Sequence, residues 1–98
     1  MAIGVLIKRT TRPGINAKAL LPFIVELRSH AVKQPGYISG ETLFNLERSD
    51  ECLVVSRWVS LEHWKEWNRS ARRMKLDEGM QDLLGAETEY TLFGVGLW

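Results

Sequence analysis

The residues best suited to chemistry are three tryptophans that lie within ten positions of one another. Trp58, Trp64 and Trp67 share their segment with two polar side chains, His63 and Asn68. Indole rings offer large apolar surfaces against which a flat aromatic molecule can stack. A histidine titrates near neutral pH and can take a proton, and an amide can hold an oxygen atom. The segment therefore predicts a cleft for a small aromatic molecule or, most simply for Trp64, ordinary core packing.

Two tyrosines and three arginines are further candidates for contacts with a substrate. Tyr37 and Tyr90 could hydrogen-bond a phenolic ring, although strand packing also explains both. Arg57, Arg72 and Arg73 could bind an acidic substrate, although arginine side chains are mostly exposed to solvent. We predict four substrate-binding residues, Trp67, Trp58, Tyr37 and Arg72, and two catalytic residues, His63 and Asn68.

The side chains that commonly bind metals do not form a ligand pattern. His63 and His30 have no second histidine or carboxylate at ligand spacing, so we predict no metal and no cofactor. Cys52 is the one cysteine, which excludes an internal disulfide and a cysteine-rich zinc site. It is typical of a small buried apolar residue in a reducing compartment. The sequence has no phosphate-binding loop, dinucleotide fingerprint or nucleophile elbow.

Length and composition predict one small globular domain over residues 1–98. Hydrophobic residues make up 45% of the chain and charged residues 26%, as in ordinary globular proteins. The net charge of +1 argues against a nucleic-acid-binding protein. No segment approaches the roughly 20 apolar residues that span a bilayer, and residues 2–7 lack the preceding basic residues of a signal peptide. We therefore expect a cytoplasmic protein that binds neither membrane nor nucleic acid.

The first half of the chain is expected to form a strand, a helix and a second strand. The apolar run over residues 3–10 predicts a buried strand. Asn16 is expected to cap a helix that runs to about Lys33 and that kinks or restarts at Pro22. Residues 37–47 alternate between apolar and polar side chains, which predicts a strand. Gly40 within it indicates a bulge or the close approach of another group.

The second half is expected to add a strand, a helical segment and a last strand. Residues 52–59 are rich in β-branched side chains and follow a short polar turn, so they predict the second arm of a hairpin. Ser60 is a candidate N-cap of a helical segment that ends at Gly85. We expect this segment to form a short helix, a bend near residues 68–70 and a longer helix. Residues 88–96 predict the last strand.

This β-α-β-β-α-β order predicts an α+β fold of the ferredoxin-like type. Two interlocked β-α-β halves give a four-stranded antiparallel sheet with both helices on one face. Leu6, Leu43 and Leu92 cannot all lie on the helix side, so the second face of the sheet is expected to be apolar. A second copy packed sheet to sheet is the simplest cover for it, which predicts a homodimer.

Two segments of the chain carry a resemblance to a known family. Residues 34–42 read QPGYISGET, and residues 55–67 read VSRWVSLEHWKEW; Ser70 to Arg73 and Tyr90 also fit. These segments resemble the antibiotic biosynthesis monooxygenase family, which belongs to the dimeric α/β-barrel proteins. The resemblance covers nearly the whole chain. It implies the ferredoxin-like fold and a homodimer. The family includes monooxygenases that use neither metal nor flavin, and many members without a known activity.

The same family includes haem-degrading enzymes, which resemble this chain at Trp67. Their pattern also needs an asparagine in the first strand and a histidine ten residues after that tryptophan. Here residues 4–8 read GVLIK, and position 77 holds an aspartate. Both differences count against haem degradation.

Three hypotheses about function follow from the residues and the resemblance. The first is a cofactor-independent monooxygenase that oxidises a small electron-rich aromatic, of hydroquinone or polyphenol type, with molecular oxygen. The second is a non-catalytic dimeric module that binds a small molecule or acts as a structural partner, since no convincing acid–base pair is present. The third, and the weakest, is a haem-binding or haem-degrading protein.

Overall fold

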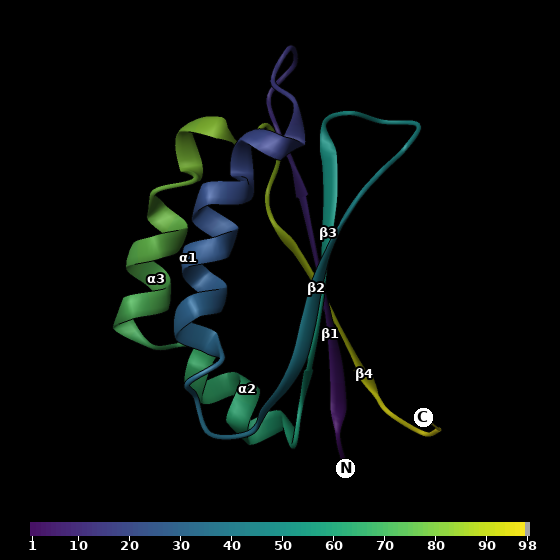
Figure 1. Ribbon diagram of the computed structural model, residues 1–98, viewed down its shortest axis with the longest axis vertical. Helices are drawn as coiled ribbons and strands as arrows, with labels where there is room; N and C mark the ends of the chain where they lie inside the picture. The colour runs from purple at the N-terminus through teal and green to yellow at the C-terminus, as the bar shows by residue number, and fades with distance from the viewer. Residues whose placement is uncertain (98) are drawn as a thin grey trace.

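The chain forms a four-stranded antiparallel sheet that is covered on one face by helices (Figure 1). The computed structural model describes residues 1–97. The strand order in the sheet is β2-β3-β1-β4. The strands are β1 (Ile3–Thr10), β2 (Tyr37–Phe44), β3 (Glu51–Trp58) and β4 (Glu89–Gly94), and the helices are α1 (Leu21–Ala31), α2 (Leu61–Asn68) and α3 (Ala71–Glu78). This arrangement confirms the predicted α+β, ferredoxin-like fold.

The first helical segment restarts at the proline, as predicted. The side chain of Asn16 accepts a hydrogen bond of 2.9 Å from the backbone N–H of Lys18 and begins a short 3-10 helix, η1 (Ala17–Leu20). Pro22 lies in the first turn of α1, where a backbone N–H has no partner within the helix. The helix can therefore accept the proline at its start without losing a hydrogen bond.

The second helical segment is split by a bend, but its second part is shorter than predicted. Ser60 caps α2, and Ser70 caps α3 by accepting a 3.2 Å hydrogen bond from the backbone N–H of Arg73. The expectation of a longer second helix is wrong, because α3 stops at Glu78 and has eight residues, like α2. Gly79 follows as its C-cap, and the chain continues as a 3-10 turn, η2 (Gln81–Leu83).

The second strand also ends earlier than expected. β2 stops at Phe44 rather than near residue 47. The side chain of Asn45 accepts hydrogen bonds from the backbone N–H groups of Glu47 and Arg48, at 2.8 and 3.0 Å. An asparagine that binds the backbone two residues on forms a turn, which competes with the ladder.

Gly40 lies where another group approaches the strand closely, one of the two alternatives predicted for it. The register of β2 against β3 shifts between Tyr37 and Ser39, so the irregularity precedes the glycine. A Cβ atom at Gly40 would lie 2.7 Å from the hydroxyl oxygen of Tyr37. The glycine therefore leaves the space that the tyrosine hydroxyl occupies.

The core lies between the sheet and the helices. Ile3, Val5 and Ile7 alternate along β1 and are buried against the helical layer. Successive side chains of a strand point to opposite faces, so Arg9 continues the same inward face. It is buried too, with only 2% of its surface exposed. The helix-facing side of β1 therefore ends in a charged residue.

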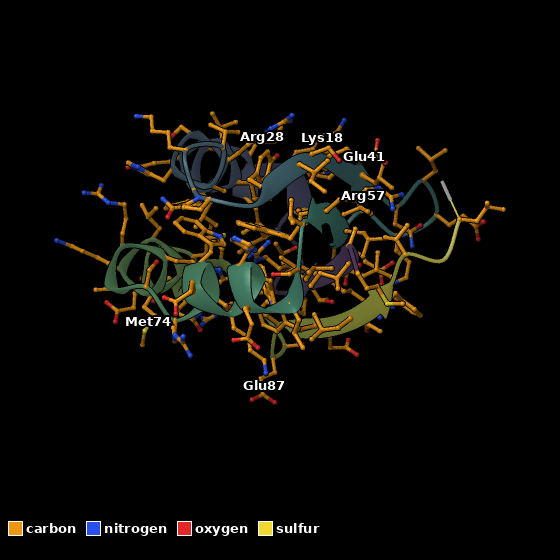
Figure 2. The ribbon with its side chains drawn as sticks, turned by 90° about the horizontal axis from the view of Figure 1, so that it is seen from below. Lys18, Arg28, Glu41, Arg57, Met74 and Glu87 are labelled. Carbon is orange, nitrogen blue, oxygen red and sulfur yellow. The ribbon has the colours of Figure 1, made fainter. Side chains whose placement is uncertain are left out.

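The opposite face of the sheet carries no helix within residues 1–97 (Figures 1 and 2). Leu6 pairs with Val55 and lies on this face, together with the exposed Leu43 and Phe93. Leu92 lies instead on the helix side, because it pairs with the buried Val5. Figure 2 shows Glu41 and Arg57 on the side of the sheet away from the helices. Within the described residues, no helix is long and apolar enough to cross a bilayer.

Candidate functional site

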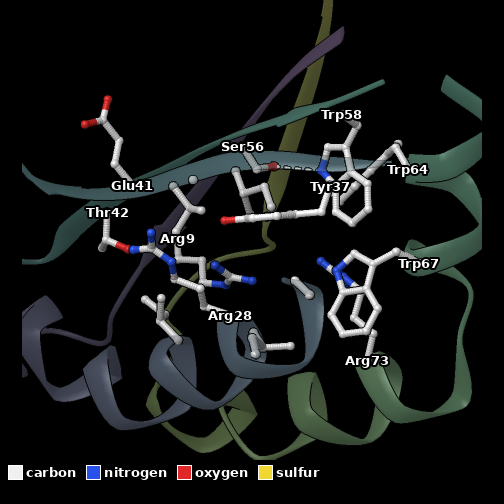
Figure 3. A pocket seen from close by; sticks show the side chains of 16 residues that line it. Arg9, Arg28, Tyr37, Glu41, Thr42, Ser56, Trp58, Trp64, Trp67 and Arg73 are labelled. Atoms are coloured by element: carbon white, nitrogen blue, oxygen red, sulfur yellow. Dashed lines mark hydrogen bonds between the residues drawn. The ribbon is translucent and has the colours of Figure 1, made fainter. Parts of the chain in front are cut away.

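A pocket lies between α1 and the sheet, and α2 and α3 close one end of it (Figure 3). The free space inside it that the centres of water-sized molecules can occupy is about 60 Å³, several times what one water molecule needs. Its side chains come from β1, α1, β2, β3, α2 and α3. Binding sites for small molecules commonly have an apolar lining with a few polar groups. The apolar lining comes from Ile7, Ile24, Leu27, Ala31, Val54, Trp58, Trp64 and Trp67.

One end of the pocket is aromatic. The rings of Tyr37 and Trp58 meet edge to face, with centroids 5.4 Å apart, and those of Trp58 and Trp64 lie 5.9 Å apart. The indole N–H of Trp58 donates a 3.2 Å hydrogen bond to Ser56. Edge-to-face contacts of this kind hold rings in fixed orientations. The aromatic end is therefore a rigid wall.

The helix α2 places two tryptophans against this wall. Trp64 and Trp67 are three residues apart, so they share one face of the helix, and both are buried. The N-cap Ser60 fixes the first turn of α2 by accepting a hydrogen bond from the backbone N–H of His63. The capping serine and the tryptophan spacing together explain why these rings line the pocket.

A partly buried network of charged and polar groups lies beside the tryptophans. Arg73 donates hydrogen bonds to Asp77, at 2.6 Å, and to the hydroxyl of Tyr90, at 2.9 Å. Its guanidinium also lies 5.5 Å from the ring centres of Trp64 and Tyr90, a cation–π geometry. Arg9 donates a longer hydrogen bond, of 3.4 Å, to the other oxygen of Asp77. Two buried arginines therefore share one carboxylate.

Two buried polar atoms of the pocket lining have no hydrogen-bond partner within residues 1–97. They are Nε of Arg9 and the hydroxyl of Tyr37. Figure 3 shows the tyrosine hydroxyl directed away from the tryptophans and toward the end of the pocket where Arg9 and Arg28 lie. Leaving such groups unpaired costs about 1–3 kcal/mol each, and more for charged groups. A ligand that accepts hydrogen bonds from them would recover this free energy.

The structure brings some of the predicted site residues together and leaves others apart. Trp67, Trp58 and Tyr37 line the pocket. Asn68 ends α2 outside the residues that line it. His63 faces the loop before β2: its Nδ1 lies 2.7 Å from the Ser60 hydroxyl, and its ring packs against Gly36.

Arg72 is the fourth predicted binding residue, and it lies on the outer surface between α1 and α3. Its Nη1 is 3.5 Å from Nε2 of His30. The side chain is exposed and is not among those that line the pocket beside Trp67. The binding role of Arg72, like the catalytic roles of His63 and Asn68, stays a prediction.

The neighbouring arginine differs from the expectation of a solvated surface. Arg73 is 4% exposed and lines the pocket. Its spacing of four residues from Asp77 on a helix was a signal that the two side chains meet. Arg9 was missed altogether, although the alternation along β1 places it on the buried face.

Cys52 matches its predicted role as a small buried apolar residue. It is fully buried on β3, and this burial raises the pKa of its thiol. Desolvation disfavours a thiolate, so Cys52 is a poor nucleophile. Nowhere in residues 1–97 do three or more histidine, cysteine or acidic side chains gather as metal ligands would.

Comparisons with known proteins point to one family. Residues 2–79 match the family model described as antibiotic biosynthesis monooxygenase. The comparison with curated proteins found no match.

Several solved structures share the fold. A conserved protein from Methanosarcina mazei is 19% identical, with a TM-score of 0.84 over 95% of this chain and 91% of that one. SnoaB, a cofactor-independent oxygenase from Streptomyces nogalater, is 10% identical, with a TM-score of 0.85 over 99% and 95%. A conserved protein from Bacteroides thetaiotaomicron is 18% identical, with a TM-score of 0.79 over 94% and 95%. Because these sequence identities are low, the similarity shows a shared fold and nothing about activity.

Proposed function

Because the chain belongs to the antibiotic biosynthesis monooxygenase family, we propose that it oxidises a small electron-rich aromatic molecule with molecular oxygen and without a cofactor. The substrate would be of hydroquinone or polyphenol type. The observation that carries the proposal is the pocket under α1, which has aromatic walls and two buried polar atoms without partners. SnoaB, which shares the fold, is a cofactor-independent oxygenase, and this supports the same class of chemistry.

The chemistry needs no electrons from outside the substrate. A hydroquinone that loses a proton becomes an anion that can pass one electron to oxygen. Recombination of the two radicals forms a carbon–oxygen bond, and loss of water leaves a hydroxyquinone. One hydroquinone and one dioxygen thus give one hydroxyquinone and one water. The protein has to hold the ring in a dry site, orient it and help the proton leave.

Different pocket residues would hold the ring, bind a substrate oxygen and assist loss of the proton. Trp67 and Trp58 would form the wall along which the ring lies, and the hydroxyl of Tyr37 would bind a substrate oxygen. His63 was predicted as the group that takes the proton, with water as the alternative. Since His63 packs against Gly36 outside the pocket lining, the proposal gives this role to a water molecule at the open mouth.

Oxygen consumption tests the proposal. Metal-stripped protein is mixed with a panel of hydroquinones and polyphenols, and uptake is compared with the uncatalysed background. We expect uptake above background, and a decrease of roughly tenfold to a hundredfold in Trp67→Phe, which keeps an aromatic ring but changes its shape. Met74→Ala is the control, because Met74 is exposed on α3 and does not line the pocket. Uptake that is equal in both variants would argue against the pocket as the site.

A non-catalytic binding module is the second candidate. It is favoured by the position of His63, which leaves the pocket lining without a histidine. In that case the pocket binds an aromatic ligand, Trp67→Phe changes its affinity, and no substrate of the panel is consumed.

We also propose that the open face of the sheet is covered by a second copy of the chain. On this face β4 presents the exposed residues Glu89, Thr91 and Phe93, and Phe93 is 54% exposed. Apolar side chains of this face lie beside charges of both signs, such as Lys8 and Glu89, whose side chains are 3.5 Å apart. A face with apolar patches and both charges can complement itself across a two-fold axis.

Sedimentation of the purified protein tests the dimer. We expect the parent chain to sediment as a dimer and the double variant Leu43→Lys, Phe93→Lys to sediment as a monomer, because buried like charges oppose the interface. Met74→Lys places the same charge on the helical side and should remain dimeric. A parent chain that stays monomeric at high concentration, or a double variant that stays dimeric, would contradict the proposal.

A further inference from the structure

Arg9 is a buried cation that its surroundings only partly satisfy. Its side chain is 2% exposed, and within residues 1–97 the guanidinium makes one hydrogen bond, the 3.4 Å contact with Asp77. The same carboxylate is held more closely by Arg73, at 2.6 Å. Burying a charged group is costly unless it is paired and hydrogen-bonded. Among the described residues, the Nε–H of Arg9 is therefore a donor without an acceptor.

The charges around the pocket leave an excess of positive charge. In the buried part, Arg9 and Arg73 contribute two positive charges, and Asp77 contributes one negative charge. At the mouth, Arg28 adds a third cation from α1. Glu41 also borders the pocket, but Figure 3 shows its carboxylate directed away from the cavity. The inside of the pocket is therefore short of one negative group.

The pocket is also polar at one end and aromatic at the other. In Figure 3 the tryptophans lie on one side, and Arg9 and Arg28 lie on the other, with the ring of Tyr37 between them. A ligand that fits both ends has a flat ring and an acidic group at its edge. The edge of a guanidinium presents parallel N–H donors that match the two oxygens of a carboxylate. A carboxylate is charged at neutral pH without further help from the protein.

We propose that the pocket binds a small aromatic carboxylate, with the carboxylate against Arg9 and the hydroxyl of Tyr37 and the ring against the tryptophans. The inference rests on the same pocket as the proposed function and specifies its substrate as a phenol or hydroquinone that bears a carboxylate. Arg9 then becomes the residue that selects acidic over neutral aromatics. The binding step itself requires no oxidation.

Benzoate and benzamide form a matched pair of probes, because they have nearly the same shape and differ in charge. Their binding is measured through the fluorescence of the pocket tryptophans and by calorimetry, at one pH and one ionic strength. We expect benzoate to bind at least about tenfold more tightly than benzamide, the usual difference for a hydrogen bond to a charged group. Equal affinity for the two probes would overturn the proposal, as would failure of benzoate to bind.

Three variants test whether Arg9 is responsible. Arg9→Met should abolish the preference for benzoate, whereas Arg9→Lys should keep part of it because the charge remains. Arg9→Met is expected to fold, since Asp77 keeps its bond to Arg73; a thermal melt checks this. Arg69→Met removes an arginine whose side chain is 63% exposed and does not line the pocket, so it should leave the preference unchanged. A folded Arg9→Met protein that still prefers benzoate would overturn the proposal.

The experiment separates this proposal from that of oxidation, because benzoate has no oxidisable hydroxyl. Tight benzoate binding, together with no oxygen uptake from any hydroquinone or polyphenol of the panel, would support the carboxylate site and count against the monooxygenase. Rapid oxidation of an uncharged hydroquinone, together with equal affinity for benzoate and benzamide, would support the monooxygenase and count against the carboxylate site.

Discussion

Replacing Trp58 by alanine is expected to lower the free energy of unfolding by about 3–5 kcal/mol, the range for truncating a large buried aromatic side chain. Trp58 is 1% exposed and contacts the rings of both Tyr37 and Trp64. The truncation leaves a cavity between β3 and α2, and Ser56 loses the indole N–H that donates to it. Small domains are stable by only about 5–15 kcal/mol, so this loss is a large fraction of the total.

Urea denaturation of three proteins measures this effect. Trp58→Phe keeps an aromatic ring at the site and should lose much less stability than Trp58→Ala. Leu46→Ala removes a fully exposed apolar side chain and should change the free energy of unfolding by no more than about 0.5 kcal/mol. A Trp58→Ala protein as stable as Leu46→Ala would show that the aromatic wall does not hold the helices to the sheet.

Replacing Asp77 by alanine is expected to lower the free energy of unfolding by about 3 kcal/mol, the lower end of the range for removing one partner of a buried ion pair, because the Asp77 side chain is itself 24% exposed. The carboxylate is the shared partner of Arg9 and Arg73, whose side chains are 2% and 4% exposed. Its loss leaves two buried guanidinium groups next to each other without a counter-charge. The two positive charges repel each other and are buried away from water, so the folded state becomes less stable.

A surface ion pair of similar spacing provides the matched control for Asp77. Glu66 and Arg69 form an ion pair three residues apart on the helical layer, with side chains that are 70% and 63% exposed. Glu66→Ala should therefore cost no more than about 1 kcal/mol. If urea denaturation shows the same small loss of unfolding free energy for Asp77→Ala and Glu66→Ala, the network around Asp77 does not stabilise the fold.

A bound anion should restore part of the stability that Asp77→Ala loses, because it can replace the missing negative charge. Benzoate, the probe for the pocket, is expected to raise the melting temperature of Asp77→Ala more than that of the parent chain. Benzamide carries no charge and should raise the melting temperatures of the two proteins by a smaller and similar amount. This difference links the stability of the network to the charge of the pocket.

The elements of the fold could be predicted because their signals are local. The apolar run of β1, the capping residues Asn16 and Ser60, and the proline at the start of α1 each act within a few residues. The length of α3 was overestimated because the apolar residues that follow it, such as Met80, are buried by a turn rather than by a helix. Periodicity alone does not separate these two cases.

The aromatic part of the pocket could also be predicted, but its charged part could not. The spacing of Trp64 and Trp67 places both on one helix face, so a tryptophan wall follows from sequence. Arg9, Asp77 and Tyr90 lie on three different elements, and only the packing of α3 against the sheet brings them together. The alternation of β1 marked Arg9 as inward-facing, and this signal carried no information about its partners.

Whether His63 faces the pocket also depends on the three-dimensional arrangement of α2. One helical position separates it from Trp64, and this rotates its ring away from the pocket and onto Gly36. The positive φ of Gly36, 84°, and the absence of a side chain there let the histidine pack closely. The sequence placed His63 near the tryptophans but did not define which side of α2 faces the pocket.

Incorporation of heavy-isotope oxygen tests the central claim most directly. Metal-stripped protein is given a hydroquinone and labelled dioxygen, and the product is analysed by mass spectrometry. Thr42→Phe, which fills the pocket from β2, is compared with Leu46→Phe, which places the same ring on an exposed position. The account predicts one labelled oxygen atom in the hydroxyquinone from the parent chain and from Leu46→Phe, with little product from Thr42→Phe. Product without label, or equal labelled product from the folded Thr42→Phe protein, would contradict oxidation by dioxygen in this pocket.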